Sequence, residues 1–465
     1  MDLGSPIRKL GGGLSRWSEK WVPDPFVLAI LLTLVSLLIG RLFFSGAADP
    51  GTPVLEVLLE GWRDSFFSPG LLRFAFQMCL VLVTGHALAT APSVQRLTTK
   101  LAALPKTTAQ AAVLVSLVSM LAGILHWGLA AVVGAFLARE IGRGSTQLGK
   151  RLHYPVLGAA AYMGLLVWHG GLSGSAPLAV ASEGHFLAST IGVIPTSETL
   201  FSAFNLTITG TVLVVVPLLL AAMAPKGDAQ IISFSEVVKR GISDTESPAR
   251  DPHSESNSGF SAWLENSRFL SSAIGSLGLV WIGTRLALGK VGFDLDSVNF
   301  LFLFIGLLAQ GSPRQYAEAV VEGAKGSAGI ILQFPFYFGI LGLLKASGLI
   351  GSLAAAMAGI TSDGLLGVAT FWMAGLVNLF VPSGGGQWAI QGELVCSAAT
   401  ASGASVPHTI MAFAYGDALT NMLQPFWALP LLGITGLKAR EIVGYTAAIM
   451  IIIAPLISVL VYLMM

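Results

Sequence analysis

The sequence predicts an all-α polytopic membrane protein with two inverted-topology repeats, each containing a re-entrant hairpin and a broken transmembrane helix. Three observations predict this fold class. Hydrophobic residues make up 54% of the 465 positions and charged residues only 11%, whereas a soluble domain carries about 25% charged residues. Apolar runs long enough to cross a bilayer recur along the chain. Several runs are interrupted by Gly, Pro and polar residues, which is the pattern of broken helices.

The composition also argues against other classes of protein. With 26 Lys and Arg against 25 Asp and Glu, the chain has no basic excess for binding nucleic acid. Its charge is too low for the surface of a soluble enzyme or for a disordered protein. Cys79 and Cys396 lie in apolar runs, so we expect neither a disulfide framework nor a cysteine metal site. No cofactor is expected.

Residues 1–24 predict an amphipathic helix on the inner surface of the membrane. Apolar residues recur there at helical spacing, together with four basic residues, Arg8, Lys9, Arg16 and Lys20. The first apolar run, 26–39, begins too late for a signal peptide, so we interpret it as the first span. The N-terminus is then cytoplasmic.

A polar stretch at 226–265 divides the chain and predicts a cytoplasmic linker, because it is rich in Ser and carries charges of both signs. The expected organisation has five parts. They are an interfacial N-terminus (1–24), a first transmembrane repeat (25–225), the linker (226–265), an extra transmembrane helix (266–290) and a second, inverted repeat (291–465). The extra helix reverses the second repeat in the membrane.

Clusters of Lys and Arg constrain the topology, because such clusters concentrate on the cytoplasmic side. If every cluster is inside, runs 108–141 and 364–401 must each enter and leave on one side, as re-entrant hairpins. Runs 154–190 and 405–437 must each cross once, as broken helices. The prediction is nine crossings and two hairpins.

The two halves resemble each other. Tyr162 and Tyr415 occupy matching places in the two broken helices, and the halves share one order of elements: span, amphipathic connector, span, hairpin, broken helix, span. Inverted repeats with hairpins and broken helices are the architecture of secondary transporters.

The helix interruptions predict the functional site, because irregular backbone at membrane depth persists only where protein or water satisfies it. Four interruptions occur, at 126–128, 169–177, 382–387 and 421–425. Helix N-termini there can bind an anion, and freed carbonyls can bind a cation. The candidate residues are His126, Trp127, Gly128, His169, Ser173, Gly174, Ser175, Ser383, Gly384, Gly385, Gly386, Gln387, Asp417, Asn421 and Gln424.

Ionisable residues at membrane depth are functional candidates by default. Asp417 lies one helical turn before Asn421 and is the best single candidate for binding a cation or exchanging a proton. A Na+ ion near Ser383, Asp417 and Asn421 would fit these residues, but they do not decide between H+ and Na+. A structural explanation is also open, since Gly often serves helix packing and His169 could be a neutral buried imidazole.

Several long motifs resemble the bacterial short-chain fatty acid transporters of the acetoacetate/butyrate uptake type. The matches run over nearly the whole chain and include Trp21-Val22-Pro23-Asp24-Pro25, Val83-Thr84-Gly85-His86-Ala87-Leu88, Gly171-Leu172-Ser173-Gly174-Ser175-Ala176-Pro177-Leu178, Gln333-Phe334-Pro335-Phe336-Tyr337, Val381-Pro382-Ser383-Gly384-Gly385-Gly386 and Gln424-Pro425-Phe426-Trp427-Ala428-Leu429-Pro430. The resemblance implies a multi-pass carrier of a small monocarboxylate in the bacterial inner membrane. This chain differs from the family pattern at His126 and His169, where the family tends to have Asn and Gly.

We therefore expect alternating-access transport of short-chain fatty acids, coupled to H+ or Na+ and without a nucleic-acid partner. A carrier of dicarboxylates on the same fold, a passive channel and an intramembrane serine protease using Ser173 are the alternatives. The sequence leaves chain length, flux direction and oligomeric state open.

Overall fold

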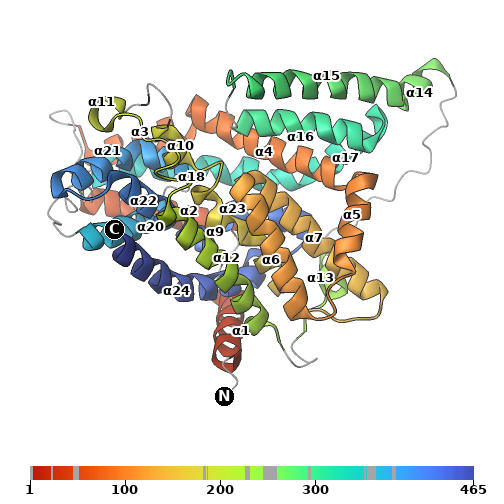
Figure 1. The fold of residues 1–465 in the computed structure, drawn as a ribbon, viewed down its shortest axis with the longest axis horizontal. Coiled ribbons are helices and arrows are strands. Elements are labelled where there is room, and N and C mark those ends of the chain that lie inside the picture. The colour runs from red at the N-terminus through yellow and green to blue at the C-terminus, as the bar shows by residue number, and fades with distance from the viewer. Residues whose placement is uncertain are drawn as a thin grey trace.

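The computed structural model describes residues 4–21, 23, 25–45, 52–181, 185, 187–225, 231–243, 259–291, 295–349, 352, 363–379 and 384–465. Within these residues the regular structure is helical, which confirms the predicted all-α class (Figure 1). The inverted relation of the two halves stays a prediction.

The first half of the chain contains the helices α1 (Gly4–Trp21), α2 (Pro25–Leu42), α3 (Val54–Phe66), α4 (Pro69–Ala89), α5 (Pro92–Ala102), α6 (Thr108–Leu125), α7 (Trp127–Gln147), α8 (Tyr154–Tyr162), α9 (Gly164–Val167), η1 (Trp168–Gly170), α10 (Ser175–Val180), α11 (Ala188–Ile191) and α12 (Ala203–Met223). The second half contains α13 (Phe234–Ser243), α14 (Phe260–Glu265), α15 (Arg268–Ala287), α16 (Leu295–Gln310), α17 (Pro313–Ala324), η3 (Lys325–Ser327), α18 (Ala328–Ala346), α20 (Asp363–Asn378), α21 (Gly384–Ser402), α22 (Val406–Thr420), η4 (Asn421–Leu423), α23 (Pro425–Thr435) and α24 (Ala439–Met464).

Many of these helices have the length and composition of membrane spans. Six helical stretches among the described residues are long and apolar enough to cross a bilayer: Thr108–Leu125, Tyr154–Val180, Ala203–Met223, Arg268–Ala287, Pro313–Ala346 and Ala439–Met464. Shorter apolar helices occur at Phe26–Leu42, Ala75–Leu88 and Asn299–Gln310. These spans make the protein a multi-pass membrane protein.

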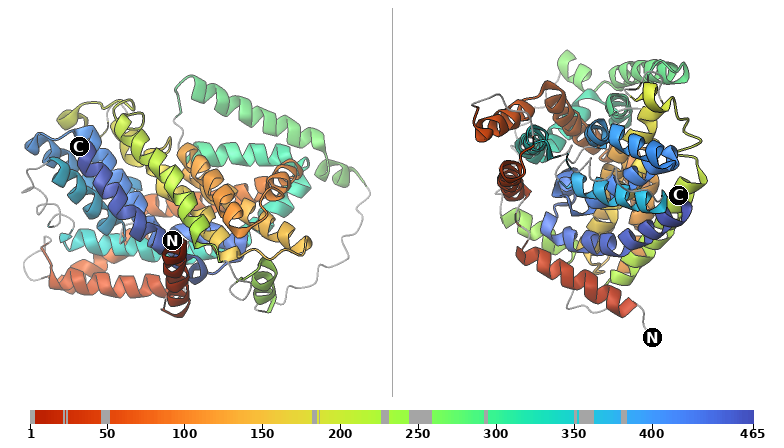
Figure 2. Two further views of the ribbon diagram at one scale, coloured as in Figure 1. Left: turned by 60° about the horizontal axis from the view of Figure 1, so that its bottom comes forward. Right: turned by 90° about the vertical axis from the view of Figure 1, so that its left-hand side faces the viewer.

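The helices form two groups. In one group α15 and α16 lie side by side at the edge of the molecule, with α4 and α17 packed beneath them, while α18 packs against α2 and α3 (Figures 1 and 2). In the other group each hairpin packs on the broken helix that follows it in the chain, α6–α7 on α8 and α20–α21 on α22. The second group holds the predicted interruptions at 126–128, 169–177 and 421–425 and, of the one at 382–387, the described residues 384–387.

The N-terminal helix α1 lies under the second group, where it packs along α24 and α12 (Figure 1). A Cβ at Gly11 would meet the Met223 side chain at 3.0 Å, so the contact with α12 is close. Inside the stretch 226–265, where the sequence predicts a linker, the structure places α13 and α14. Val237 of α13 is buried, so this stretch contributes packing as well as connection.

Glycines hold each hairpin close to its broken helix. In the first half a Cβ at Gly123 of α6 would lie 2.4 Å from the carbonyl oxygen of Gly164 in α9. In the second half a Cβ at Gly416 of α22 would lie 1.9 Å from the carbonyl oxygen of Phe371 in α20, and Gly375 faces the Gly416 carbonyl. Glycine permits backbone-to-backbone approach of this kind between helices. The two halves therefore share a packing device at matching places.

Candidate functional site

The first broken helix opens between Val167 and Ser175. Helix α9 ends at Val167, η1 follows at Trp168–Gly170, and α10 begins at Ser175. The opened segment rests on the end of α6, where Leu172 N–H donates to the Ile124 carbonyl at 2.7 Å. A Cβ at Gly171 would lie 2.4 Å from that same carbonyl oxygen, so only glycine allows this approach.

The tip of the first hairpin is seated on this opened segment. His126 ends α6 and caps α7, and its Nδ1 accepts a hydrogen bond from Gly128 N–H at 3.0 Å. Trp127 N–H donates to the Ser173 hydroxyl oxygen at 3.1 Å. A donor that the start of α7 would otherwise leave unpaired is thus satisfied by the broken helix.

The second broken helix opens between Thr420 and Pro425. Helix α22 ends at Thr420, η4 covers Asn421–Leu423, and α23 begins at Pro425. Tyr162 of α8 reaches across, and its hydroxyl lies 2.9 Å from the carbonyl oxygens of both Asn421 and Gln424. The Tyr162 hydroxyl therefore provides a hydrogen-bond donor for the carbonyls that have no helical partner at the second opening.

A matching contact steadies the first opening. The Asn205 amide of α12 donates to the Gly170 carbonyl at 2.9 Å, and the Tyr415 hydroxyl donates to the Asn205 carbonyl at 3.1 Å. Thus Tyr162 acts on the break of the second half, and Tyr415, through Asn205, on the break of the first half. Both tyrosines are buried.

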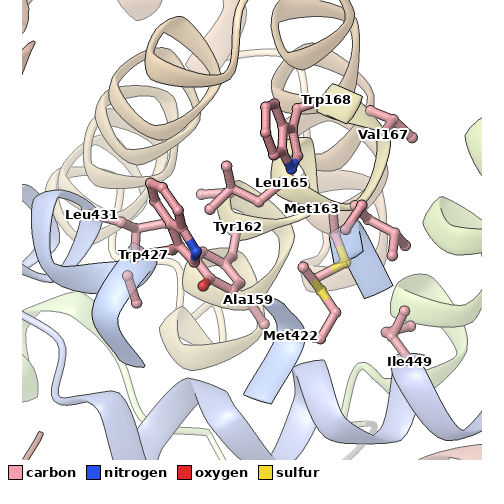
Figure 3. Packing of buried hydrophobic residues seen from close by; sticks show 14 of the residues in the cluster. Ala159, Tyr162, Met163, Leu165, Val167, Trp168, Met422, Trp427, Leu431 and Ile449 are labelled. Atoms are coloured by element: carbon pink, nitrogen blue, oxygen red, sulfur yellow. The ribbon is translucent and has the colours of Figure 1, made fainter. Parts of the chain in front are cut away.

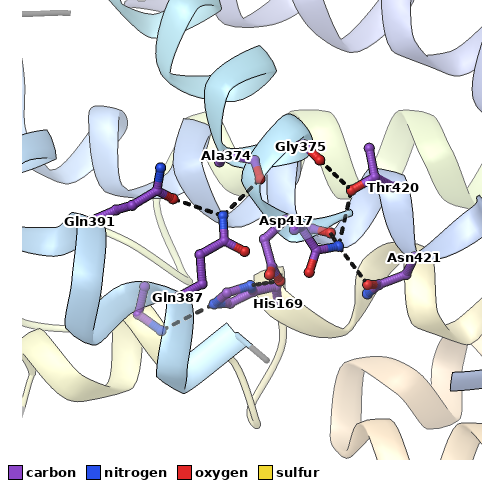
Figure 4. A network of polar contacts seen from close by, with 10 residues as sticks. His169, Ala374, Gly375, Gln387, Gln391, Asp417, Thr420 and Asn421 are labelled. Carbon is purple, nitrogen blue, oxygen red and sulfur yellow. Dashed lines mark hydrogen bonds and ion pairs between the residues drawn. The ribbon is translucent and has the colours of Figure 1, made fainter. Parts of the chain in front are cut away.

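His169 and Asp417 join the two broken helices. Nδ1 of His169 lies 2.7 Å from Oδ2 of Asp417, and both side chains are 0% exposed (Figure 4). Nε2 of His169 accepts a hydrogen bond from Ala176 N–H at 3.1 Å. Because Nε2 must keep its lone pair for that bond, the imidazole is neutral, and its Nδ1–H donates to Asp417.

The end of α20 is tied to the second opening by amide side chains. The Asn378 amide nitrogen donates to the Asp417 carbonyl at 2.7 Å, to the Thr420 hydroxyl at 3.0 Å and to the Asn421 side-chain oxygen at 2.8 Å. The Gln424 amide nitrogen donates to the Asn378 carbonyl. Because the partners of each amide nitrogen are acceptor oxygens, these bonds distinguish the nitrogen from the oxygen in the side chains of Asn378 and Gln424.

The start of α21 reaches the same centre. The Gln387 amide nitrogen donates to the Ala374 carbonyl at 2.7 Å and to the Gln391 side-chain oxygen at 2.8 Å (Figure 4). A Cβ at Gly384 would lie 2.6 Å from the Trp168 ring and 3.2 Å from Cε1 of His169. The second hairpin therefore meets the first broken helix at His169.

Several side-chain oxygens at this centre accept no hydrogen bond within the described part of the chain. Oδ1 of Asp417, Oδ1 of Asn378 and Oε1 of both Gln387 and Gln424 are buried and accept no hydrogen bond from the described residues. Leaving a buried acceptor unpaired costs about 1–3 kcal/mol. In Asn378, Gln387 and Gln424 the amide nitrogen already donates to an acceptor oxygen. Exchanging the amide nitrogen and oxygen would therefore not give the unpaired oxygens a donor. Oxygen-rich groups of this kind suit a cation.

Aromatic side chains wall the centre. The Trp168 ring stacks on His169 with centroids 4.5 Å apart, and the Trp127 and Trp427 rings meet edge to face at 5.2 Å. Figure 3 shows Leu165 between the Trp168 and Trp427 side chains, with Tyr162 beside Trp427. The polar centre thus has an apolar wall beside it.

The structure brings most of the predicted residues together. Those at the polar centre or bonded to it are His169, Gly384, Gln387, Asp417, Asn421 and Gln424. Those at the tip of the first hairpin and its seat are His126, Trp127, Gly128, Ser173 and Gly174. Ser175 lies near Gly385, whose added Cβ would be 3.8 Å from the Ser175 hydroxyl. Gly386 lies in the first turn of α21, and Ser383 lies outside the described residues.

Sequence reasoning missed Asn378, Asn205 and Gln391, and it gave Tyr162 no part in the site. Asn378 is the last residue of α20, four positions before the predicted interruption at 382–387, and Asn205 lies near the start of a strongly apolar helix. A lone buried amide at the end of an apolar run was the available signal for both.

The described residues thus define a multi-pass helical membrane protein whose broken helices and hairpins meet around a buried polar centre. A family model described as short chain fatty acid transporter matches residues 6–464, and the chain belongs to this family. The resemblance inferred from the motifs is confirmed.

Two curated relatives cover nearly the whole chain, and both are named "Putative short-chain fatty acid transporter". The protein of Escherichia coli (strain K12) is 38% identical over 443 residues, which are 94% of this chain and 96% of the relative. That of Haemophilus influenzae (strain ATCC 51907 / DSM 11121 / KW20 / Rd) is 36% identical over 458 residues, which are 97% of this chain and 98% of the relative.

Two solved structures align with the chain. MtrF of Neisseria gonorrhoeae is 14% identical with a TM-score of 0.41, covering 96% of this chain and 97% of its own. The YdaH transporter of Alcanivorax borkumensis is 18% identical with a TM-score of 0.45, covering 95% of this chain and 98% of its own.

Proposed function

We propose that the protein carries short-chain monocarboxylates across the bacterial inner membrane by alternating access, with its site where the four helix interruptions meet. The observation that carries this proposal is the buried His169–Asp417 pair, set among acceptor oxygens that have no donor within the described residues. Membership of the short-chain fatty acid transporter family supports the substrate class.

The substrate carboxylate binds near the start of α21. Gly384 and Gly385 lie in its first turn, and they face Trp168, His169 and Ser175 of the first broken helix. Helix N-termini favour anions, because their first N–H groups have no partner within the helix. The aromatic wall beside His169 accommodates a short alkyl chain, which supports a monocarboxylate over a dicarboxylate.

The coupled cation binds Asp417. A neutral His169 leaves the carboxylate charge uncompensated, and a buried charge requires a partner. One proton on Oδ1 would satisfy Asp417 alone, whereas a Na+ ion would also use the amide oxygens of Asn378, Gln387 and Gln424. The surplus of oxygens therefore supports Na+, which in turn offsets the charge of the substrate.

The protease alternative finds no support in the contacts of Ser173. Its hydroxyl accepts a hydrogen bond from Trp127 N–H, while both ring nitrogens of His169 are engaged, one by Asp417 and the other by Ala176.

The alternating motion would move the hairpins and broken helices against the spans α2 and α16. The Arg and Lys clusters support a cytoplasmic N-terminus.

Uptake of labelled butyrate into proteoliposomes tests this function. An inward Na+ gradient imposed without a pH gradient should drive accumulation above the external concentration. Accumulation with a pH gradient alone would assign the coupled ion as H+. Equilibration without accumulation under either gradient would identify a passive channel, and stronger inhibition by succinate than by butyrate would identify a dicarboxylate carrier.

A further inference from the structure

A cavity lies beside the middle of α7 and the end of α23, two helices that begin at the candidate site. Its volume is about 240 Å³, and its walls come from α4, α7, α13, α17, η3 and the end of α23. Helix α7 begins at Trp127 and helix α23 follows Gln424. Arg139 and Gly436 each line the cavity twelve residues further along, which is about 18 Å at the rise of an α-helix.

The charged groups that line the cavity, Arg139, Lys325 and Glu322, carry one net positive charge. A further titratable group, His86, also lines the cavity. Glu322 and Lys325 form an ion pair of 2.5 Å. Arg139 is half-buried and makes no hydrogen bond or ion pair with the described residues. Its neighbour Glu140 lies 4.0 Å from Arg143 instead.

The remaining walls are apolar or small. Leu82, Phe234 and Val238 contribute apolar surface. Gly323 allows close packing at the rim, since a Cβ there would lie 2.9 Å from Cβ of His86. One guanidinium beside an apolar wall fits a small organic anion with one charge, because Arg binds a carboxylate through two parallel hydrogen bonds.

We propose that this cavity is a second binding site for a short-chain monocarboxylate, held by Arg139, beside α7 and the end of α23 on the cytoplasmic side of the protein. The ligand and the orientation rest on the proposed function, but the site is separate from the centre at Asp417.

Protection of an introduced thiol tests this site. Val238 lines the cavity and is 38% exposed, so Val238→Cys in a background lacking Cys79 and Cys396 places a thiol at the mouth. A neutral reagent, methyl methanethiosulfonate, avoids any effect of charge on the reagent. Butyrate should slow the modification about twofold at a concentration equal to its Kd and about fivefold at about four times the Kd, and equal chloride should not.

Arg139→Gln should abolish the protection and Arg139→Lys should keep part of it. Arg143→Gln is the matched control, because Arg143 lies one turn away on α7 with an exposed side chain; it should leave the protection intact. Equal rates with and without butyrate, protection that persists in Arg139→Gln, or equal protection by chloride would each overturn the proposal.

Two further measurements separate binding at Arg139 from transport and from any effect of the cysteine substitutions. Protection should survive in Asp417→Asn, so loss of transport and loss of the Arg139 site are distinguishable. Binding of labelled butyrate to the protein with its own cysteines should show a second class of sites, which Arg139→Gln removes. A single class of sites unaffected by Arg139→Gln would contradict the inference.

Discussion

The Nδ1–H of His169 donates to Oδ2 of Asp417 over a distance of 2.7 Å. The two residues lie 248 positions apart in the chain, and their hydrogen bond joins the two broken helices. Ala176 N–H holds the other ring nitrogen, so the tautomer is set by the start of α10. The carboxylate is thereby oriented with Oδ1 left for a further ligand. The proposed coupling of cation and substrate rests on this geometry.

Replacing His169 tests whether this orientation matters. His169→Ala removes the donor to Asp417, and hydrogen bonds to charged groups contribute about 1.5–3 kcal/mol. We therefore expect the Na+ concentration for half-maximal butyrate uptake to rise about tenfold or more. The matched control is His185→Ala, because the hydrogen bonds of His185 within the described part of the chain go to Gly192 and Leu187, away from Asp417. An unchanged Na+ dependence in His169→Ala would show that the imidazole does not position the carboxylate.

Tyr162 is expected to support transport through the second helix opening. Tyr162→Phe leaves the Asn421 and Gln424 carbonyls without their donor, which should cost about 1–3 kcal/mol of stability and slow uptake. Tyr445→Phe is the control, because that buried hydroxyl pairs with His153 away from the openings at 2.9 Å. It should lower the thermal midpoint in detergent while uptake stays near normal. Equal uptake by the two variants would argue against a role for Tyr162.

The glycine contact between α20 and α22 gives a prediction about folding. Gly416→Ala places a Cβ 1.9 Å from the Phe371 carbonyl oxygen, and overpacking of this kind costs about 1–3 kcal/mol or more. The thermal midpoint should therefore fall. Gly210→Ala is the control on α12, where an added Cβ meets nothing within 4 Å and helix propensity improves by up to about 1 kcal/mol. A midpoint in Gly416→Ala at or above that of Gly210→Ala would contradict the packing.

Much of the fold could be predicted from the sequence. Low charge and long apolar runs predict membrane helices, and the Gly- and Pro-containing interruptions lie where the structure opens helices at Trp168–Gly170 and Asn421–Leu423. The pairing of His169 with Asp417 could not be predicted, because periodicity places residues on an element but does not say which elements meet. The sequence indicates each of the two residues only as a separate candidate.

The parts that the sequence did not indicate depend on tertiary contacts. Asn378 is one amide at the end of an apolar helix, and its three hydrogen bonds exist only because α20 packs on α22. Similarly, α13 lies in a stretch whose charges suggest solvation. It docks because Ile232 N–H reaches Nδ1 of His153 and Arg240 pairs with Glu441.

Asp417→Asn provides the most direct test of the coupling. In proteoliposomes with an inward Na+ gradient, the wild type should accumulate labelled butyrate above the external concentration. The Asn variant keeps the shape of the side chain but has no charge for the cation, so it should exchange internal for external butyrate without accumulating it. Wild-type accumulation in Asp417→Asn, with the same dependence on Na+ and pH, would contradict the account.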